Sequence, residues 1–241
     1  MDPSHLTELI ELEDSYWWHV AKRRLVANLL KTHFPPPGIL VEGGIGSSRN
    51  LVEFQSHGYD VHGFDIMTAS VEHARQRGLR HVAEHNLTEP WPLPDDSVRV
   101  AVLLDVLEHV FDPVQVLQHI TRVLEPGGGV VVTVPAYPWL FGDWDKSLGH
   151  FRRYTARVLR EHARVAGLQV QWLSHWNSFS LLPAIAVRGY QRCIPRRRKP
   201  EFPRVAPWMN RMLGSMATCE RRWLERGTSP LGLSLVGVLQ K

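Results

Sequence analysis

The chain has 241 residues, of which 44% are hydrophobic and 22% are charged, and its formal net charge is +4. This length suffices for one α/β domain with its own core, and the composition excludes a disordered or fibrous chain. The two cysteines exclude a disulfide framework, and no apolar run of roughly eighteen residues predicts a membrane span. Met1 to Asp14 is polar and acidic rather than a secretory signal, so we expect a cytoplasmic protein.

The predicted elements begin with an N-terminal helical segment over residues 1–37, in which Leu6 to Thr32 is helical. Short apolar runs then alternate with amphipathic stretches. We expect strands near 38–42, 60–65, 80–85, 98–104, 129–134, 168–174 and 232–239, and helices over 48–57, 68–77, 113–124 and 155–166. This alternation predicts an α/β fold with a Rossmann-like, doubly wound sheet. The expected units are a core over 38–175, a helical basic cap or insertion over 176–229, and the last strand of the sheet over 230–241.

A glycine-rich turn after the first strand is the strongest functional signal. The strand ends at Glu42, glycines follow over 43–46, and either Ser47 or Ser48 is placed to cap the next helix. The second strand ends in another acid, Asp65. Glycines let a ligand approach the backbone, and an acid at this point can accept hydrogen bonds from ribose hydroxyls. The layout predicts a nucleotide site at the carboxyl ends of neighbouring parallel strands.

The glycine spacing discriminates between nucleotides. A dinucleotide fingerprint requires G-x-G-x-x-G, and Gly44 and Gly46 supply its first two positions. The third position is Arg49, whose bulk opposes the close packing of helix on strand. An NAD-type oxidoreductase is therefore the less favoured alternative.

The spacing Glu42-x-Gly44-x-Gly46 instead resembles the first motif of the class I S-adenosylmethionine-dependent methyltransferases. Further stretches follow in the order of the ubiquinone-biosynthesis type and related small-molecule methyltransferases. They are D-V-L-E-H-V from Asp105, D-P at Asp112, E-P-G-G-G from Glu125, V-P at Val134, and G-H-F-R-R-Y-T from Gly149. The resemblance covers residues 38–175 and the last strand. It implies seven strands with the last one antiparallel, and S-adenosylmethionine as cofactor.

The resemblance also implies which residues bind this cofactor. Glu42 and the glycine loop would face its methionine part, Asp65 its ribose, and the residues after the second and third strands its adenine. The expected cofactor-binding residues are Glu42, Gly43, Gly44, Gly46, Asp65, Ile66, Met67, Asn86, Leu87 and Leu104. Asn86 stands where the family commonly has an acid, and its amide can both donate to and accept from the adenine edge. Ser48 stands where the family often has another glycine.

His109 is the leading candidate for a general base. It follows the strand that should end beside the sulfonium, and an unperturbed imidazole titrates near neutrality. The alternative is that the Glu-His pair is a structural feature. Asp105, Glu108 and His109 also resemble a divalent-cation cluster of ubiquinone O-methyltransferases. Acids that favour a helix start explain this D-x-x-E-H pattern better, and we expect no metal.

Two further segments offer acceptor-side residues. After the fifth strand, His150 and Tyr154 are catalytic candidates, and Arg152 and Arg153 could bind an anionic group of the acceptor. The alternative is that this segment forms a surface turn without a role in binding. In the N-terminal segment, Tyr16 and Trp17 are substrate-binding candidates and His19 is a further base candidate, on a helix that would fold over the cofactor. The alternative there is hydrophobic packing onto the sheet.

Basic residues are concentrated between Arg188 and Arg226, with eleven Lys or Arg against three Asp or Glu. This segment includes Arg196 to Lys199 and follows an apolar run over 179–187. A solvated linker is the favoured interpretation, and peripheral contact with an anionic membrane is the alternative. No nucleic-acid motif accompanies the charge, so we expect no nucleic-acid partner.

These signals together predict an S-adenosylmethionine-dependent methyltransferase. The expected acceptor is an apolar, aromatic or lipid-like small molecule, methylated at oxygen. The alternatives are an NAD-type oxidoreductase and a cofactor-binding protein without catalytic activity that associates with a membrane or a partner.

Overall fold

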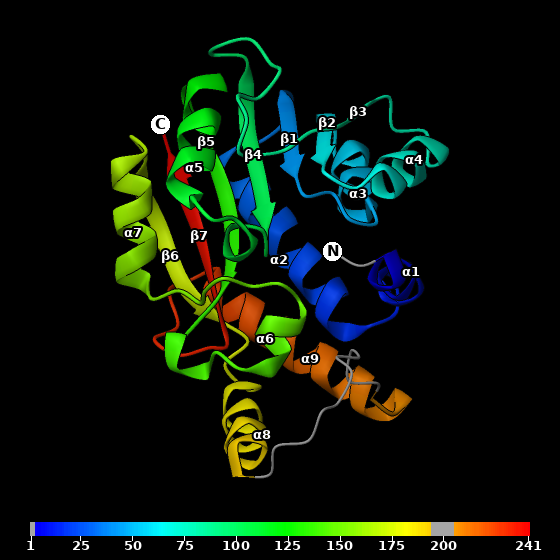
Figure 1. Cartoon of the computed structure of the whole chain (residues 1–241), viewed down its shortest axis with the longest axis vertical. Helices are drawn as coiled ribbons and strands as arrows, with labels where there is room; N and C mark the ends of the chain where they lie inside the picture. The colour runs from blue at the N-terminus through cyan, green and yellow to red at the C-terminus, as the bar shows by residue number, and fades with distance from the viewer. Residues whose placement is uncertain (1–2, 194–204) are drawn as a thin grey trace.

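The computed structural model describes residues 3–193 and 205–241 and contains one seven-stranded sheet (Figure 1). Its strands are β1 (Ile39–Gly43), β2 (Asp60–Asp65), β3 (His81–Glu84), β4 (Val98–Leu104), β5 (Leu124–Pro135), β6 (Gln169–Trp176) and β7 (Ser234–Gln240). They lie in the order β3-β2-β1-β4-β5-β7-β6, with β7 antiparallel to both of its neighbours. The predicted Rossmann-like fold with an antiparallel last strand is confirmed.

Helices cover both faces of the sheet. They are α1 (Pro3–Leu12), α2 (Trp17–His33), α3 (Arg49–Ser56), α4 (Thr68–Gln76), α5 (Pro113–Val123), α6 (Asp143–Ser147), α7 (Ala156–Val165), α8 (Leu181–Cys193) and α9 (Pro207–Leu224), with 3₁₀ turns at Leu107–His109 and Pro138–Leu140. One core cluster packs α5 and α7 against the sheet, through residues such as Leu117 and Leu159. The other packs α2, α3 and α4 against the opposite face, through residues such as Leu29, Phe54 and Val71. Among the described helices, none has the length and apolarity needed to cross a membrane.

The N-terminal helical segment is interrupted, and the break fastens it to the core. Tyr16 has an extended backbone and precedes α2. Glu13 forms an ion pair with Arg77 at the end of α4, and Asp14 pairs with Arg49 at the start of α3 at 2.6 Å. Arg49, which replaces the third glycine of the dinucleotide pattern, therefore points away from the sheet toward the N-terminal segment.

The glycine run before the fifth strand is part of that strand. We expected a strand over 129–134, but β5 begins at Leu124 and its register with β4 shifts between Val98 and Val100. A Cβ on Gly129 would lie 2.1 Å from the carbonyl oxygen of Leu239. A side chain at Gly129 would collide with the neighbouring strand, so this position requires glycine. The E-P-G-G-G sequence indicates a helix end and does not reveal this close approach.

The expectation that a serine side chain caps α3 is wrong for Ser48. Ser48 occupies the N-cap position, but its φ is +60° and its side chain makes no capping bond. Its hydroxyl instead donates to the carbonyl of Ser47 at 2.6 Å. The left-handed backbone gives a physical reason for the glycine that the family often has here.

Ser48→Gly is therefore expected to raise the free energy of unfolding by about 0.5–1 kcal/mol, because it relieves a left-handed conformation that costs a side chain about 1–2 kcal/mol. Ser48→Val should lower it, since a β-branched residue tolerates positive φ poorly. Urea unfolding followed by circular dichroism measures both changes. Loss of stability in the glycine variant would contradict this account.

Candidate functional site

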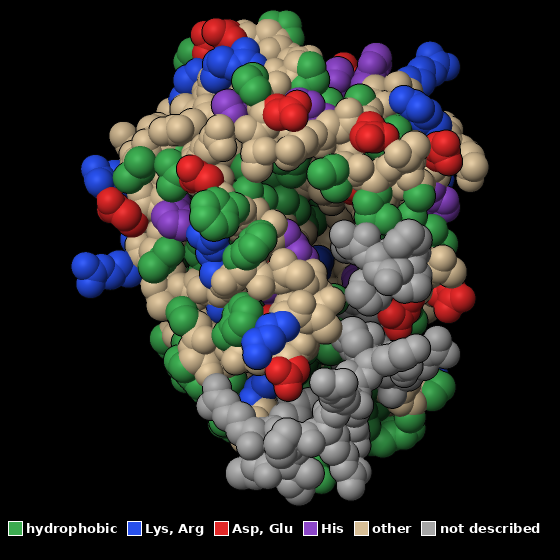
Figure 2. Space-filling model, in the orientation of Figure 1, with side chains coloured by type: hydrophobic (Ala, Val, Ile, Leu, Met, Phe, Trp, Pro, Cys, Tyr) green, Lys and Arg blue, Asp and Glu red, His purple; other side chains and the backbone are tan. Residues whose placement is uncertain are grey.

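The ends of β1, β2 and β4 bring the predicted cofactor residues to one edge of the sheet. Gly43, the last residue of β1, pairs with Phe64 of β2 and Leu103 of β4. The glycine loop, Asp65 and the turn after β4 are therefore neighbours, and they face α1, α2 and α6 (Figure 1). In Figure 2, hydrophobic side chains gather beside a hollow on this face, and histidine and Lys or Arg side chains are visible inside it.

Glu42 is a buried carboxyl at the base of this edge. Its Oε1 accepts a hydrogen bond from Nδ2 of Asn50 at 2.8 Å, whereas its Oε2 has no hydrogen-bond partner among the described residues. Burial raises the pKa of Glu42 to about 8, against the opposing effect of the Asn50 bond. A buried acid with one free acceptor atom fits the ammonium group of a bound amino acid, which would pair with it and favour its charged form. Asn50, the second residue of the helix after the glycine loop, was not predicted.

The glycine loop and Asp65 hold each other in place. The backbone N–H of Gly44 donates to the carbonyl of Phe64 at 2.7 Å, and a Cβ on Gly44 would lie 2.8 Å from Cγ2 of Val106. The N–H of Gly46 donates to Oδ2 of Asp65 at 3.0 Å, and the N–H of Met67 donates to Oδ1 at 2.9 Å. Burial raises the pKa of Asp65, and the two backbone bonds oppose that rise. Each carboxylate oxygen keeps a second lone pair that can accept from a ribose hydroxyl.

Asp65→Ala is expected to lower the affinity for S-adenosylhomocysteine at least about tenfold, because charge-assisted hydrogen bonds worth roughly 1.5–3 kcal/mol each are lost. Titration calorimetry measures the affinity, and thermal unfolding checks that the variant folds. Asp65→Asn, which keeps one acceptor oxygen for Gly46 or Met67, serves as the conservative control. A folded alanine variant with unchanged affinity would show that Asp65 does not hold the ribose.

The predicted adenine residues surround the end of β2. Ile66 is 65% exposed directly after Asp65, and Leu87 is partly buried within 3.1 Å of a Cβ built on Gly43. The amide oxygen of Asn86 accepts from the N–H and the hydroxyl of Thr88, at 3.1 and 2.9 Å. Its nitrogen is therefore the group best placed to meet a ligand. Leu104 is partly buried on the face of the sheet that α2, α3 and α4 cover, and it packs against their core cluster.

An ion pair that the sequence did not predict crosses the turn after β4. Nζ of Lys22, on α2, donates to Oδ2 of Asp105 at 2.7 Å, and the hydroxyl of Thr133 donates to Oδ1 at 3.0 Å. Burial alone would raise the pKa of Asp105, but the Lys22 ammonium and the Thr133 bond keep it below its usual range. The group of described residues here that could share a cation consists of Glu108, His109 and His150 and does not include Asp105, which the D-x-x-E-H pattern had grouped with the first two.

Two predicted histidines meet beside a buried acid. The rings of His109 and His150 lie 4.6 Å apart and perpendicular to each other. Glu108 is fully buried, and neither of its carboxyl oxygens has a hydrogen-bond partner among the described residues. Burial raises the pKa of Glu108 well above its usual value, and burial lowers the pKa of His109 to about 4. One donor atom from each of these three residues lies within 4.8 Å of the other two. Among the described residues at this edge of the sheet, these three could therefore hold a cation together.

His150 is positioned by a buried carboxylate that the sequence did not point to. Asp145 of α6 lies 3.2 Å from Nδ1 of His150, and it accepts from Nε of Arg153 at 2.7 Å and from Nη2 of Arg188 at 3.1 Å. Burial alone would raise the pKa of Asp145, but the His150 and Arg153 contacts keep it low. We call Asp145, His150, Arg153 and Arg188 the Asp145 cluster. It joins α6, the segment after α6, and α8.

The other acceptor-side candidates make structural contacts. Arg152 donates to the carbonyls of Val110 and Phe111, at 3.1 and 2.8 Å. Tyr154 is fully buried, its hydroxyl donates to the carbonyl of Leu107 at 3.1 Å, and burial raises its pKa. These contacts favour a bracing role for both residues, and Arg153 is bound in the Asp145 cluster.

The aromatic residues before and within α2 pack toward α9. Tyr16 and Trp17 are buried in a small core cluster with Ala217 of α9, and the N–H of Trp17 donates to Oδ1 of Asn210 at 2.9 Å. These contacts favour the packing alternative for Trp17. His19 lies with its ring 5.9 Å from that of Tyr16, and burial lowers the pKa of His19 to about 3.

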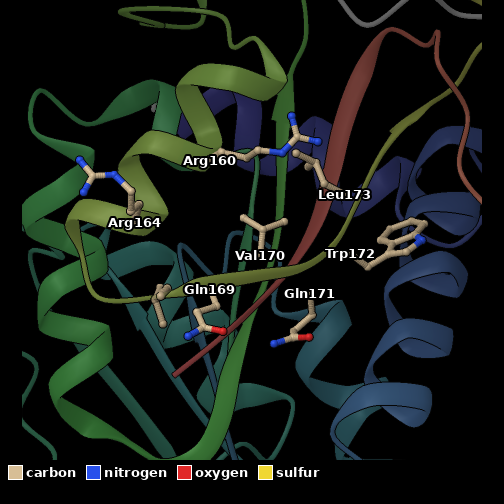
Figure 3. Close-up of a pocket in the computed structure, with 8 residues that line it drawn as sticks. Arg160, Arg164, Gln169, Val170, Gln171, Trp172 and Leu173 are labelled. Carbon is tan, nitrogen blue, oxygen red and sulfur yellow. The ribbon is translucent and has the colours of Figure 1, made fainter.

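A separate groove of about 470 Å³ lies along the edge strand β6 (Figure 3). Its lining consists of Arg160, Arg164, Leu168, Gln169, Val170, Gln171, Trp172 and Leu173. In the strand order, β6 is at one end of the sheet, with β7, β5 and β4 between it and β1. The groove is therefore remote from the glycine loop.

Comparisons with known proteins identify the family of the chain. Residues 17–173 match a family model described as a methyltransferase domain. The chain is 31% identical over 161 residues to a probable S-adenosylmethionine-dependent methyltransferase of Mycolicibacterium smegmatis; the match covers 66% of this chain and 62% of that relative, less than two thirds of its length.

Solved structures show the same fold. A SAM-dependent methyltransferase of Archaeoglobus fulgidus superposes with a TM-score of 0.64 and 15% identity, over 100% of both chains. The [4+2]-cyclase SpnF superposes with a TM-score of 0.64 and 21% identity, over 99% of this chain and 92% of that one. The resemblance to the ubiquinone-biosynthesis type stays a prediction. With a family match over more than half of its length and this seven-stranded sheet, the chain belongs to the class I S-adenosylmethionine-dependent methyltransferases.

Proposed function

We propose that the chain transfers the methyl group of S-adenosylmethionine to a hydroxyl of an apolar, aromatic small molecule. The observation that carries this proposal is the contact between His150 and His109, which follows β4, the strand that pairs with the Glu42 strand β1. The cofactor supplies an activated methyl group on its sulfonium, and a neutral thioether would leave when that methyl is transferred. The protein must then align the acceptor oxygen and remove its proton.

An apolar rim beside the histidines supports an aromatic acceptor. Phe111 is 81% exposed and Phe151 is 58% exposed, and their rings lie 6.2 Å apart, edge to face. Each follows one of the two histidines closely in sequence. Exposed aromatic side chains next to buried polar groups are typical of small-molecule sites that orient a ring.

The low pKa of His109 supports an acidic hydroxyl as the acceptor. A pKa of about 4 leaves the imidazole neutral and able to accept a proton near neutral pH, but makes it a weak base. A phenol is a much stronger acid than an aliphatic alcohol, so its proton transfer to a weak base is the less unfavourable of the two. Nδ1 of His150 faces Asp145, and this contact would fix the ring of His150, against which the ring of His109 packs.

The test is a panel of acceptors incubated with methyl-labelled S-adenosylmethionine. Phenols should be labelled at oxygen, with little transfer to aliphatic alcohols and amines of similar size. Transfer only to nitrogen or carbon would overturn the O-methylation proposal. Cofactor binding without turnover on any acceptor would favour a non-catalytic cofactor-binding protein.

We further propose that α8 and α9 contact an anionic membrane. Large apolar side chains are exposed on both helices, at Leu182 and Val187 of α8 and at Trp208 and Met212 of α9. The basic stretch that motivated this expectation, at 196–199, lies outside the described residues. Interfacial binding combines apolar burial with attraction to anionic lipid.

Vesicle flotation tests this contact. The protein should float with phosphatidylserine-containing vesicles, less so at high salt, and less in a Trp208→Ser/Met212→Ser variant. Equal recovery with neutral and anionic vesicles would contradict the electrostatic part of the proposal.

A further inference from the structure

Two histidines and an aspartate lie together at the end of β2 and β3 opposite the cofactor edge. Asp60 and His62 are two residues apart on β2, so they project from the same face of the sheet. His62 pairs in register with His81, the first residue of β3. Phe64 of the same face belongs to the core cluster of α5 and α7, so this face is the one opposite α3 and α4.

The three side chains are close enough to share one ligand. The rings of His62 and His81 are stacked, with centroids 4.6 Å apart and 12° between their planes. Nε2 of His62 lies 3.7 Å from Oδ2 of Asp60. One donor atom of each residue lies within 4.8 Å of the other two, and Asp60 and His81 are exposed enough to rotate. Metal–ligand bonds of about 2.0–2.2 Å require only a modest approach of these atoms.

The donor set selects a class of ion. Two imidazoles and one carboxylate suit zinc, nickel or copper, whereas magnesium and calcium prefer all-oxygen sites. Neutral imidazole is the form that binds metal, so binding at this site should weaken as the pH falls below the range in which imidazole is neutral.

We propose that Asp60, His62 and His81 bind one divalent transition-metal ion, with water completing a four-coordinate shell. The ion would join β3 to the rest of the sheet. β3 is a four-residue edge strand whose partner in the sheet is β2 alone, so a shared ion adds a cross-link to a short ladder. Since the cluster is at the opposite strand ends from Glu42 and Asp65, the site stands independently of the catalytic proposal.

Calorimetric titration of the full, untagged chain with zinc chloride tests this site. His62→Ala and His81→Ala should each weaken one zinc-binding event at least about tenfold, since even outer-shell changes cost metal sites about 10–100-fold. Zinc should also raise the melting temperature of the wild type more than that of either variant, by stabilising the folded state that binds it. Magnesium chloride should do neither.

Two control variants test whether the loss of zinc binding is specific to the Asp60, His62 and His81 cluster. His57→Ala removes a nearby exposed histidine outside the cluster, and His109→Ala removes a donor from the Glu108–His109–His150 group at the cofactor edge. Both should keep the zinc-binding event that His81→Ala loses. Absence of zinc binding by the wild type, or identical binding by wild type, His62→Ala and His81→Ala, would overturn the proposal.

Discussion

Glu42→Gln is expected to stabilise the free protein at alkaline pH. The folded pKa of about 8 lies above the ordinary value of 4.5, so between these values the folded state holds a proton that the unfolded state releases. Stability contributed by this group is therefore present below about pH 4.5 and is lost as pH rises toward about 8. Glutamine keeps the acceptor for Asn50 without the buried charge.

Since one pKa unit corresponds to about 1.4 kcal/mol, the variant should gain roughly 2–4 kcal/mol over the wild type above pH 8. Near pH 5 the two should unfold alike. Urea denaturation at both pH values measures the difference directly. An equal difference at both pH values would mean that Glu42 does not titrate between them.

The same substitution is expected to weaken cofactor binding. If Glu42 pairs with the ammonium of the cofactor, binding releases the Glu42 proton, and wild-type affinity should rise with pH until about 8. The variant should bind S-adenosylhomocysteine about ten- to a hundredfold more weakly above that pH and show a flatter pH dependence. Calorimetry in buffers of different ionisation enthalpy counts the released proton. Full affinity in the variant would place the ammonium elsewhere.

His109→Ala should lower kcat by about 10²–10⁴-fold while the affinity for S-adenosylhomocysteine stays nearly unchanged. An unperturbed histidine would make the wild-type rate rise through neutrality. Because burial lowers the pKa of His109 to about 4, we expect a rate that is flat from about pH 6 to about pH 8.

His57→Ala, at an exposed position, is the matched control and should keep full activity. If a cation held by Glu108, His109 and His150 assists the reaction, chelation should abolish activity and added magnesium should restore it. A variant with near wild-type turnover and no response to chelator would exclude both roles for His109. His19 and His150 would then be the bases to test.

The sequence could predict that Glu42 and Asp65 lie at one edge of the sheet because their geometry is local. Glu42 and Asp65 each end a predicted strand, and parallel strands in register place such ends side by side. Lys22 and Asp145 could not be found in this way. Lys22 reaches Asp105 across 83 positions, and Asp145 receives Arg188 from 43 residues away, through packing that leaves no spacing pattern.

The same limit explains the acceptor side. The G-H-F-R-R-Y-T stretch gathers polar groups that suit a binding site, yet Tyr154 is fully buried beneath the turn after β4. Local sequence cannot distinguish a tyrosine that faces a ligand from one that braces a loop. That distinction depends on how the segment after α6 folds back onto β5.

The Asp145 cluster has a mechanical consequence. Arg188 of α8 and His150 beside the candidate base contact the same fully buried carboxylate, and Arg153 bonds it as well. Withdrawing one cation from a buried ion pair is strongly unfavourable, so α8 and the His150 segment cannot shift independently at low cost. A displacement of α8 would therefore pull on the imidazole of His150 through their shared contact with Asp145, which couples α8 to the proposed acceptor side of the site.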